Sequence, residues 1–391
     1  MMNIDFDSYI DRHNTYSTQW DYIADRFGRN DIIPFSISDT DFAVPPEIIE
    51  TLNERLKHPI FGYTRWNHDD FKKPIATWFM QRGGSYVDTN WIVYSPSVIW
   101  TLATLIRMLS ESGDSVAVFN PMYDAFFNTI QSNQRKICPV QLNASNNIFT
   151  FDQNDLYKAC SDPNVKLLLL TNPHNPTGKV FTKDELKAIV SIAKETNTFI
   201  ISDDIHRDII LQDVPYSPIT DYTTKHVALL CSASKTFNIP GLIGSYAFLP
   251  DSDVKDSFLY ELKQKNALSS VSIFGMYAQT TAYTSCAYYV DELTNYIKLN
   301  MKCIETYFNE HLPNIKFMIP QATYLAWIDI SSLHVTSLAL QQACVDYGKV
   351  GIMSGSVYGN DAFMRMCVGC PRSKLLQGLD GFYKGVRGLC G

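Results

Sequence analysis

Residues 226–241 read HVALLCSASKTFNIPG, an apolar run that leads into a lysine surrounded by small hydroxyl residues. The run shows no strict alternation of apolar and polar residues, which is typical of a strand buried on both faces of a sheet. Lys235 would then lie just beyond the end of that strand, close to the hydroxyls of Ser232, Ser234 and Thr236. Small hydroxyl side chains donate hydrogen bonds without filling space, so the segment suits a phosphorylated ligand.

Lys235 itself has two interpretations. A lysine amine condenses with an aldehyde once it is partly deprotonated, which burial and a nearby cation favour. Alternatively, Lys235 is a solvated lysine in a serine-rich loop. The segment alone does not decide between these two interpretations, so the other segments expected near Lys235 are needed.

Four other apolar runs resemble the one before Lys235, and helical patterns lie between them. They are WIVYSP at 91–96, SVAVFNP at 115–121, KLLLLTNP at 166–173 and FIISDD at 199–204. After the third run, Thr182 and Glu185 form a capping-box signature. One helical face then collects Leu186, Ile189, Val190 and Ala193. Alternation of strands and helices predicts an α/β fold with a mostly parallel sheet and helices on both faces.

The composition excludes several classes of protein. The chain has 391 residues, 46% hydrophobic residues and a net charge of −7 without a basic block, so we expect neither a nucleic-acid surface nor a membrane-binding one. No stretch approaches eighteen apolar residues, and the first residues, MMNIDFDSYIDRH, do not resemble a secretory signal. The nine scattered cysteines indicate reduced thiols and a cytoplasmic protein. Cys367 and Cys370 form a CxxC without a second pair at zinc spacing, so no metal site is expected.

Two further segments bring polar groups to the ends of predicted strands, where open α/β sheets bind ligands. In TNPHNPTGKV, residues 171–180, two Asn-Pro steps and a glycine force a tight turn. Asn175 either forms that turn or presents its amide to a ligand's phenolic oxygen. In SDDIHRD, residues 202–208, Asp203 is placed to pair with a protonated ring nitrogen. A helix N-cap is the alternative role, and Asp204 fits it equally well.

The segment YSPSVIWTLATLIRML, residues 94–109, predicts a strand, a Ser-Pro turn and an apolar helix that begins near Val98. Free N–H groups at such a helix start, together with the helix dipole, form a phosphate site. The alternative is an ordinary connection between a strand and a helix.

Taken together, these segments resemble the fold-type I pyridoxal-phosphate enzymes, the aspartate aminotransferase superfamily. They are most similar to its MalY/PatB-type cystathionine β-lyase branch, the cysteine-S-conjugate β-lyases. The resemblance runs nearly end to end in the same order and spacing. It is carried by FDSYIDRHNTYSTQWD, ISDTDF, FGYTRW, NPMYDAF, NPHNPTGKVF, SDDIHRDI, SKTFNIPG, ATYLAW and FMRMCVGCPR.

The resemblance implies a cofactor, pyridoxal 5′-phosphate, and a role for each matching residue. Lys235 would bind the cofactor as a Schiff base and act as the general base at the substrate's Cα. Asp203 would bind the ring nitrogen and Asn175 the phenolic oxygen. Tyr123 would stack on the ring. The phosphate would be held by the backbone amides of Val98 and Ile99 and by Ser232 and Ser234.

Three more residues receive roles from the resemblance. Arg365 would bind the substrate α-carboxylate through a bidentate fork. Tyr63 would reach the cofactor and substrate of the neighbouring subunit, so a homodimer is implied. His206 is either a neighbour of the ring oxygen or a packed histidine. Residues 49–286 would form the large cofactor-binding domain, residues 1–48 an N-terminal arm and part of the small domain, and residues 287–391 the rest of the small domain.

The chain departs from the family pattern at several positions. Thr40 replaces a usual Met, and Cys367 a usual Asn. Ser97 and Trp100 replace Gly and Pro in the phosphate segment, so the resemblance is less informative there. Two departures favour the lyase branch over the transaminases, which are Ile243 in place of a phosphate-binding arginine and His206 in place of a tyrosine.

We therefore expect an enzyme that cleaves S-substituted L-cysteines, such as cystathionine, to a thiol, pyruvate and ammonia. The alternatives are an aminotransferase, which shares the steps up to the carbanion, and a cofactor-binding regulatory protein without turnover. A pocket for apolar S-substituents is expected among the aromatics Tyr16, Tyr123 and Trp327. Arg372 is either a second cationic contact or structural, and His174 is expected to be a turn residue.

Overall fold

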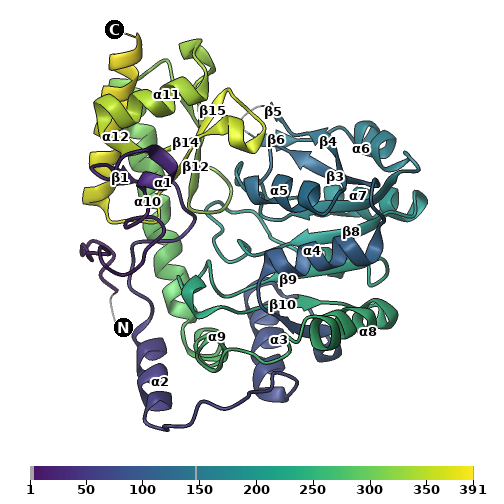
Figure 1. The fold of residues 1–391 in the computed structure, drawn as a ribbon. Helices are drawn as coiled ribbons and strands as arrows, with labels where there is room; N and C mark the ends of the chain where they lie inside the picture. The colour runs from purple at the N-terminus through teal and green to yellow at the C-terminus, as the bar shows by residue number, and fades with distance from the viewer. Residues whose placement is uncertain (1–3, 146–147, 391) are drawn as a thin grey trace.

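The computed structural model describes residues 4–145 and 148–390, and its largest element is a seven-stranded sheet (Figure 1). The strands run in the order β2-β10-β9-β8-β7-β3-β4, and β10 is antiparallel to both of its neighbours. Their bounds are β2 Ile92–Ser95, β3 Ser115–Asn120, β4 Lys136–Gln141, β7 Val165–Thr171, β8 Phe199–Asp203, β9 Val227–Cys231 and β10 Ser245–Phe248. The expected mostly parallel α/β sheet is confirmed, although β4 and β10 were not among the strands predicted from sequence.

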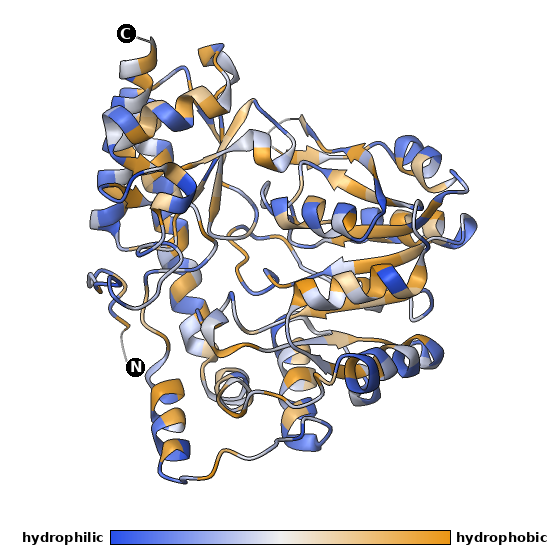
Figure 2. Ribbon diagram, viewed as in Figure 1, coloured by the Kyte–Doolittle hydropathy of each residue, from blue (hydrophilic) through white to orange (hydrophobic). Residues whose placement is uncertain are grey.

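The sheet separates two hydrophobic cores, because alternate side chains of a strand point to opposite faces. One core contains Val116, Val118, Leu167, Leu169 and Ile201, and the other contains Ala117, Phe119, Leu168, Leu170 and Ile200. In Figure 2 the strands of this sheet are mostly orange, whereas the surrounding helices carry blue outer faces. The apolar runs of the sequence are therefore strands that are buried on both faces.

Helices cover both faces of the sheet. They are α3 Asp69–Gly83, α4 Val98–Leu109, α5 Asp124–Ser132, α6 Gln153–Cys160, α7 Lys183–Glu195, α8 Ser252–Tyr260 and α9 Ile273–Ser285. Helix α4 begins at Val98 as predicted, with Ser97 as its N-cap. Helix α7 begins with the predicted capping box, in which Thr182 Oγ1 accepts from Glu185 N and Glu185 Oε2 accepts from Thr182 N.

The C-terminal part of the chain forms a second, four-stranded sheet in the order β11-β12-β15-β14, shown at the upper left of Figure 1. The helices and strands of this C-terminal part are α10 Ala287–His311, β11 Lys316–Phe317, β12 Leu325–Asp329, α11 Ser337–Ala343, β14 Met353–Ser354, β15 Phe363–Cys367 and α12 Arg372–Cys390. Strand β1, Ile33–Pro34, pairs in parallel with β13, Val350–Gly351, so the N-terminal segment is attached to this part of the molecule.

Three smaller pieces lie outside these two parts. Helix α1, Ala24–Phe27, precedes β1, and helix α2, Pro46–Leu56, packs against α9. Strands β5, Asn143–Ser145, and β6, Ile148–Thr150, form a two-stranded antiparallel sheet. Within the described residues, no helix has the length and apolar character that crossing a membrane requires.

Candidate active site

A cavity of about 470 Å³ opens at the carboxyl ends of β7, β8 and β9, next to the start of α4. The position is the ligand-binding edge expected for an open α/β sheet. Most of the side chains predicted from sequence line it, namely Val98, Ile99, Tyr123, Asn175, Asp203, His206, Ser232, Ser234 and Lys235. Residues that lie more than 130 positions apart in the chain therefore meet at one site.

The amine of Lys235 lies inside this cavity and donates a hydrogen bond to the carbonyl oxygen of Ser38, with an Nζ–O distance of 2.5 Å. Burial lowers the pKa of the amine, and the positive charge of Arg365 acts in the same direction. The negative charges of Asp39 and Asp203 oppose that shift. A lowered pKa makes the unprotonated amine more available as a nucleophile or base. Because Lys235 lines a cavity and its amine is bonded to Ser38 O, it is not a solvated surface lysine.

Asp203 and Asp204 end the same strand but face different surroundings. Asp203 lines the cavity, and burial raises the pKa of its carboxyl to about 7 against a smaller opposing effect of its hydrogen bond from Ile205 N. Asp204 instead accepts hydrogen bonds from Ser202 Oγ and Tyr216 OH. The structure therefore separates two carboxylates that the sequence left equivalent, and it assigns the ligand-facing position to Asp203.

Asn175 and Arg365 are joined directly. Arg365 Nη1 donates to Asn175 Oδ1 at 3.1 Å, and Arg365 Nη2 donates to Ser36 O at 2.7 Å. The guanidinium also lies 4.4 Å from the centre of the Tyr358 ring. Arg365 is 2% exposed, and its Nε has no hydrogen-bond partner among the described residues. These contacts hold the guanidinium beside the cavity before any anion arrives.

The start of α4 borders one end of the cavity. The Ser97 hydroxyl accepts a hydrogen bond from Trp100 N at 3.1 Å, which leaves the first amides, those of Val98 and Ile99, without an intrahelical acceptor. Across the cavity, Ser232 Oγ donates to Gly244 O and accepts from Ser234 N. Among the described residues that line the cavity, Lys235 is the only lysine or arginine.

Tyr123 and His206 occupy the remaining walls. Tyr123 is the N-cap of α5, and its ring packs edge-on against Phe126. His206 is 3% exposed, and its Nδ1 has no hydrogen-bond partner among the described residues. Burial lowers the pKa of His206 to about 3, with further lowering by the charges of Lys235 and Arg365. The imidazole is therefore neutral, with one buried nitrogen that still needs a partner.

The arrangement fits pyridoxal phosphate on four independent features. The amine of Lys235 faces the cavity for a bond to an aldehyde, and Asp203 offers a carboxylate to a ring nitrogen. The free amides of α4 suit a phosphate. The unpartnered Nδ1 of His206 offers a polar contact to a ring substituent. A cavity of about 470 Å³ also lies within the usual range for small-molecule sites.

Several predicted residues lie elsewhere. Tyr63 is 99% exposed in the segment between α2 and α3, so the subunit does not bring it to its own cavity. The expected aromatic pocket is wrong for two of its three members. Tyr16 is 85% exposed, and Trp327 stacks on Phe363 and borders a different cavity. Arg372 Nε donates to Asn300 Oδ1, which supports its structural role.

Sequence reasoning also missed one wall of the site. Ser38 and Thr171 line the cavity, and Ser38 contributes the carbonyl that accepts from Lys235. The available signal was the motif ISDTDF, residues 37–42, which was recognised but received no function. His174 fulfils its expected turn role, because its Nδ1 lies 2.9 Å from Thr177 Oγ1 within the same turn.

Comparisons with known proteins agree with this geometry. Residues 30–382 match the profile of a family described as aminotransferase class I and II. The chain is 42% identical to protein MalY of Escherichia coli over 98% of this chain and 99% of that protein. It is 34% identical to cystathionine beta-lyase PatB of Bacillus subtilis, over 96% and 98% of the two chains. The crystal structure of cystalysin from Treponema denticola, which contains pyridoxal 5′-phosphate, superposes with a TM-score of 0.93 at 28% identity and covers 99% of each chain.

Proposed function

Because the chain belongs to the aminotransferase class I and II family, we propose that it is a pyridoxal 5′-phosphate-dependent carbon–sulfur β-lyase. Its substrates are S-substituted L-cysteines, cystathionine among them, and its products are a thiol, pyruvate and ammonia. The observation that carries the proposal is the meeting of Lys235 and Asp203 in one cavity, beside which Arg365 is held by Asn175, in a chain whose relative PatB is named a cystathionine beta-lyase.

Three residues would orient the cofactor and the substrate. Asp203 would hold the proton on the ring nitrogen, since a carboxylate beside a cation favours the charged forms of both groups. Asn175 would hold the phenolic oxygen, and the amides at the start of α4 would hold the phosphate. Arg365 would bind the α-carboxylate, for which its planar fork is suited. When bound, pyridoxal phosphate supplies a cationic ring that withdraws electrons from the substrate's Cα.

Lys235 would carry the proton transfers. Its amine takes the proton from Cα, and the electron pair left behind forms the Cα–Cβ double bond as the Cβ–S bond breaks. The sulfur leaves as a thiol with the proton that Lys235 returns. Water then converts the released aminoacrylate to pyruvate and ammonia. The lowered pKa of the amine supports this role, because a less basic lysine is unprotonated in a larger fraction of molecules.

We further propose a cytoplasmic homodimer in which Tyr63 serves the partner's site. The segment between α2 and α3 exposes Ile60, Phe61 and Tyr63, with 65%, 53% and 99% of their surface accessible in the single chain. Exposed apolar residues in one continuous segment are typical of an interface. We also propose that residues 1–48 and 287–391 form one small domain, which the pairing of β1 with β13 supports.

The test combines a spectrum with a reaction. The purified protein should bind pyridoxal phosphate with the visible absorbance of a lysine-bound cofactor, and Lys235→Ala should lose that band and all turnover. Lys302→Ala, at an exposed lysine on α10, is the matched control and should keep both. With cystathionine and no keto acid, thiol and pyruvate should accumulate over many turnovers per subunit. Amino-group transfer that requires an added keto acid would instead identify an aminotransferase.

A further inference from the structure

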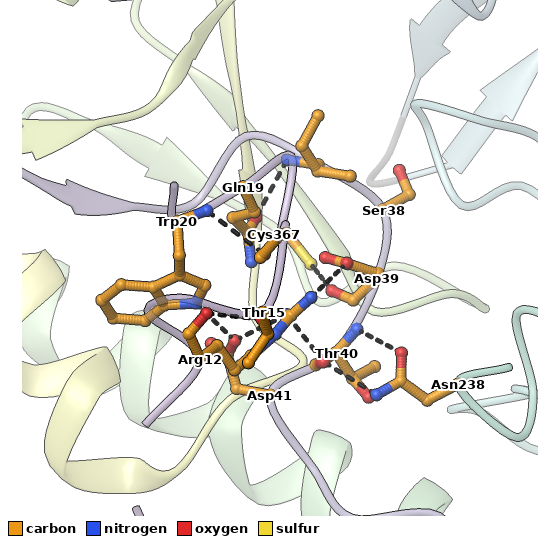
Figure 3. A network of polar contacts seen from close by, with 12 residues as sticks. Arg12, Thr15, Gln19, Trp20, Ser38, Asp39, Thr40, Asp41, Asn238 and Cys367 are labelled. Atoms are coloured by element: carbon orange, nitrogen blue, oxygen red, sulfur yellow. Dashed lines mark hydrogen bonds and ion pairs between the residues drawn. The ribbon is translucent and has the colours of Figure 1, made fainter. Parts of the chain in front are cut away.

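Segments from three parts of the chain meet in one polar cluster, of which Figure 3 labels Arg12, Trp20, Asp39 and Asp41. The N-terminal arm brings Arg12 and Trp20, loop 36–42 brings Asp39 and Asp41, and the C-terminal part brings Lys374. Asp41 and Lys374, which are bonded directly, are 333 positions apart in the chain, so the cluster exists only in the folded protein.

Loop 36–42 supplies backbone carbonyls to both cations of the site. Ser38 O accepts from Lys235 Nζ at 2.5 Å and from Tyr324 OH at 3.1 Å. Ser36 O accepts from Arg365 Nη2 at 2.7 Å. The amine and the guanidinium are therefore held by alternate residues of the same short segment. A small displacement of this segment would move both groups relative to the cavity.

The N-terminal arm fixes this loop from one side. Arg12 Nη2 donates to Asp39 Oδ2 at 2.7 Å, while Arg12 Nη1 donates to Asp41 Oδ1 at 2.9 Å and to Thr40 O at 3.1 Å. Gln19 Oε1 accepts from the amide of Ile37, which lies between the two carbonyls of the site. Arg12 thus bridges two carboxylates and one carbonyl, which a shorter or monodentate donor does not do.

Two other parts of the chain hold the loop from the opposite sides. Asn238, three residues after Lys235, donates to Thr40 O and Phe42 O and accepts from Thr40 N. Lys374 Nζ donates to Asp41 Oδ2 at 2.5 Å. Within the cluster, the side chains of Arg12, Asp39, Asp41 and Lys374 are 21%, 14%, 5% and 6% exposed. Loss of Arg12 would leave Asp39 without its ion-pair partner in this mostly buried setting, whereas Asp41 would keep Lys374.

We propose that Arg12 is a positioning residue for the reaction, because its bridge to Asp39 and Asp41 holds loop 36–42 where Ser38 O and Ser36 O fix Lys235 and Arg365. The inference rests on the proposed function only in that Lys235 must bind the cofactor. It gives the segment around Arg12 a function at the active site, although no described residue before Ser38 lines the cavity.

The charge of Asp39 predicts the direction in which each substitution should shift the pKa of Lys235. The charged or titratable groups that face Lys235 are Asp39, Cys367, Arg365, Asp203 and His206. Of these, Asp39 raises the pKa of the lysine amine most strongly. Replacing Arg12 with Gln removes the guanidinium that neutralises Asp39, so the pKa of Lys235 should rise. Asp39→Asn removes the negative charge, so the pKa of Lys235 should fall. A merely structural defect would not move the two variants in opposite directions.

The experiment follows uptake of pyridoxal phosphate by the cofactor-free protein as a function of pH, since the unprotonated amine reacts with the aldehyde. Arg12→Gln should shift the uptake profile upward by about one pH unit, which is about 10-fold slower uptake below the midpoint. Asp39→Asn should shift it downward. Arg29→Gln, which breaks an exposed pair with Asp31, is the matched control and should leave the profile unchanged.

An Arg12→Gln profile that coincides with wild type, or shifts in the same direction for both variants, would overturn the proposal. If Arg12→Gln does not fold, Arg12→Lys provides a second test of the proposal. Its charge should restore the wild-type midpoint, but kcat should remain lower because an ammonium does not bridge both carboxylates. An unchanged kcat in that variant would also overturn the proposal. A wild-type protein that takes up cofactor but releases no thiol would refute the lyase reaction and leave this comparison intact.

Discussion

At the scale of single residues, Asp203 and Asp204 show how two adjacent buried carboxyls differ in function because their neighbours differ. The carboxyl of Asp204 accepts hydrogen bonds from Ser202 and Tyr216, so both of its oxygens have partners inside the protein. Asp203 has one backbone donor and faces the cavity. Asp203→Asn in the loaded enzyme should lower kcat by about 100-fold, because an amide does not stabilise a cationic ring nitrogen. Asp204→Asn should lower stability and retain the cofactor spectrum, and a larger loss of kcat in that variant would contradict the assignment.

The raised pKa of Asp203 also predicts a pH dependence of stability in the cofactor-free protein. The folded carboxyl titrates at about 7 and the unfolded one near 3.8, so the folded state binds an extra proton between these values. Stability therefore falls as pH rises through this range, and the penalty is complete above about pH 7. Cofactor-free Asp203→Asn should exceed wild type by at most about 4 kcal/mol near pH 8, and the difference should vanish near pH 4.

Urea unfolding of both proteins at several pH values measures this difference. His174 and His206 act in the opposite direction, because their lowered pKa values remove stability as pH falls below 6.5. Both histidines are present in wild type and variant, so their effect cancels in the comparison. A difference that stays constant with pH would show that Asp203 is not buried as described.

Arg365 provides a third test at the residue scale. Arg365→Lys should raise KM by roughly 10- to 100-fold, since a charge-assisted hydrogen bond contributes about 1.5–3 kcal/mol. The same variant should still take up pyridoxal phosphate, because Arg365 does not line the phosphate end of the cavity. Arg372→Lys is the matched control from the same motif, and its KM should stay at the wild-type value because Arg372 contacts Asn300.

Much of the site was predictable because strand ends carry ligand-binding residues, and the apolar runs before Lys235, Asp203 and Asn175 place all three at one edge. The contacts of Arg12 and Lys374 were not predictable from patterns. Asp41 is 29 residues from one and 333 from the other, and no local periodicity records a contact over such separations. Pattern also did not separate Asp203 from Asp204, because the difference depends on which neighbour each carboxyl meets.

At the scale of elements, the start of α4 combines a structural cap with a ligand site. Ser97→Ala removes the acceptor for Trp100 N, which should cost about 1 kcal/mol of stability and loosen the amides that are proposed to hold the phosphate. Dissociation of pyridoxal phosphate should therefore be faster. Thr182→Ala removes the cap of α7, remote from the cavity, and should cost similar stability without affecting dissociation. Equal dissociation rates in the two variants would contradict the phosphate role of α4.

Two strands escaped prediction for physical reasons that concern their place in the sheet. Strand β4 pairs on one side with β3 only, is largely half-buried or exposed, and contains Pro139, so it lacks the apolar run of a central strand. Strand β10, only four residues long, is antiparallel to both neighbours. A segment this short gives little periodicity, and its direction depends on the chain connections rather than on its composition.

At the scale of the whole molecule, the proposed dimer predicts complementation between two inactive proteins. Lys235→Ala loses the amine, and Tyr63→Ala loses the side chain offered to the partner. If Tyr63 serves the neighbouring site, a hybrid dimer keeps one site with both groups intact. Unfolding and refolding an equal mixture should restore about a quarter of the wild-type sites, since half of the dimers are hybrids. Activity that stays at the level of the separate variants would place Tyr63 outside the partner's site.

The phosphate end of the cavity also bears on how the protein takes up its cofactor. Peptide dipoles and hydroxyls surround that end, and the one lysine among the described lining residues, Lys235, is proposed to bond the aldehyde. An anion held without a guanidinium exchanges more readily with chloride, sulfate or free phosphate. We therefore expect sulfate or free phosphate to compete with the cofactor's phosphate group at this end of the cavity and to slow its uptake by the cofactor-free protein.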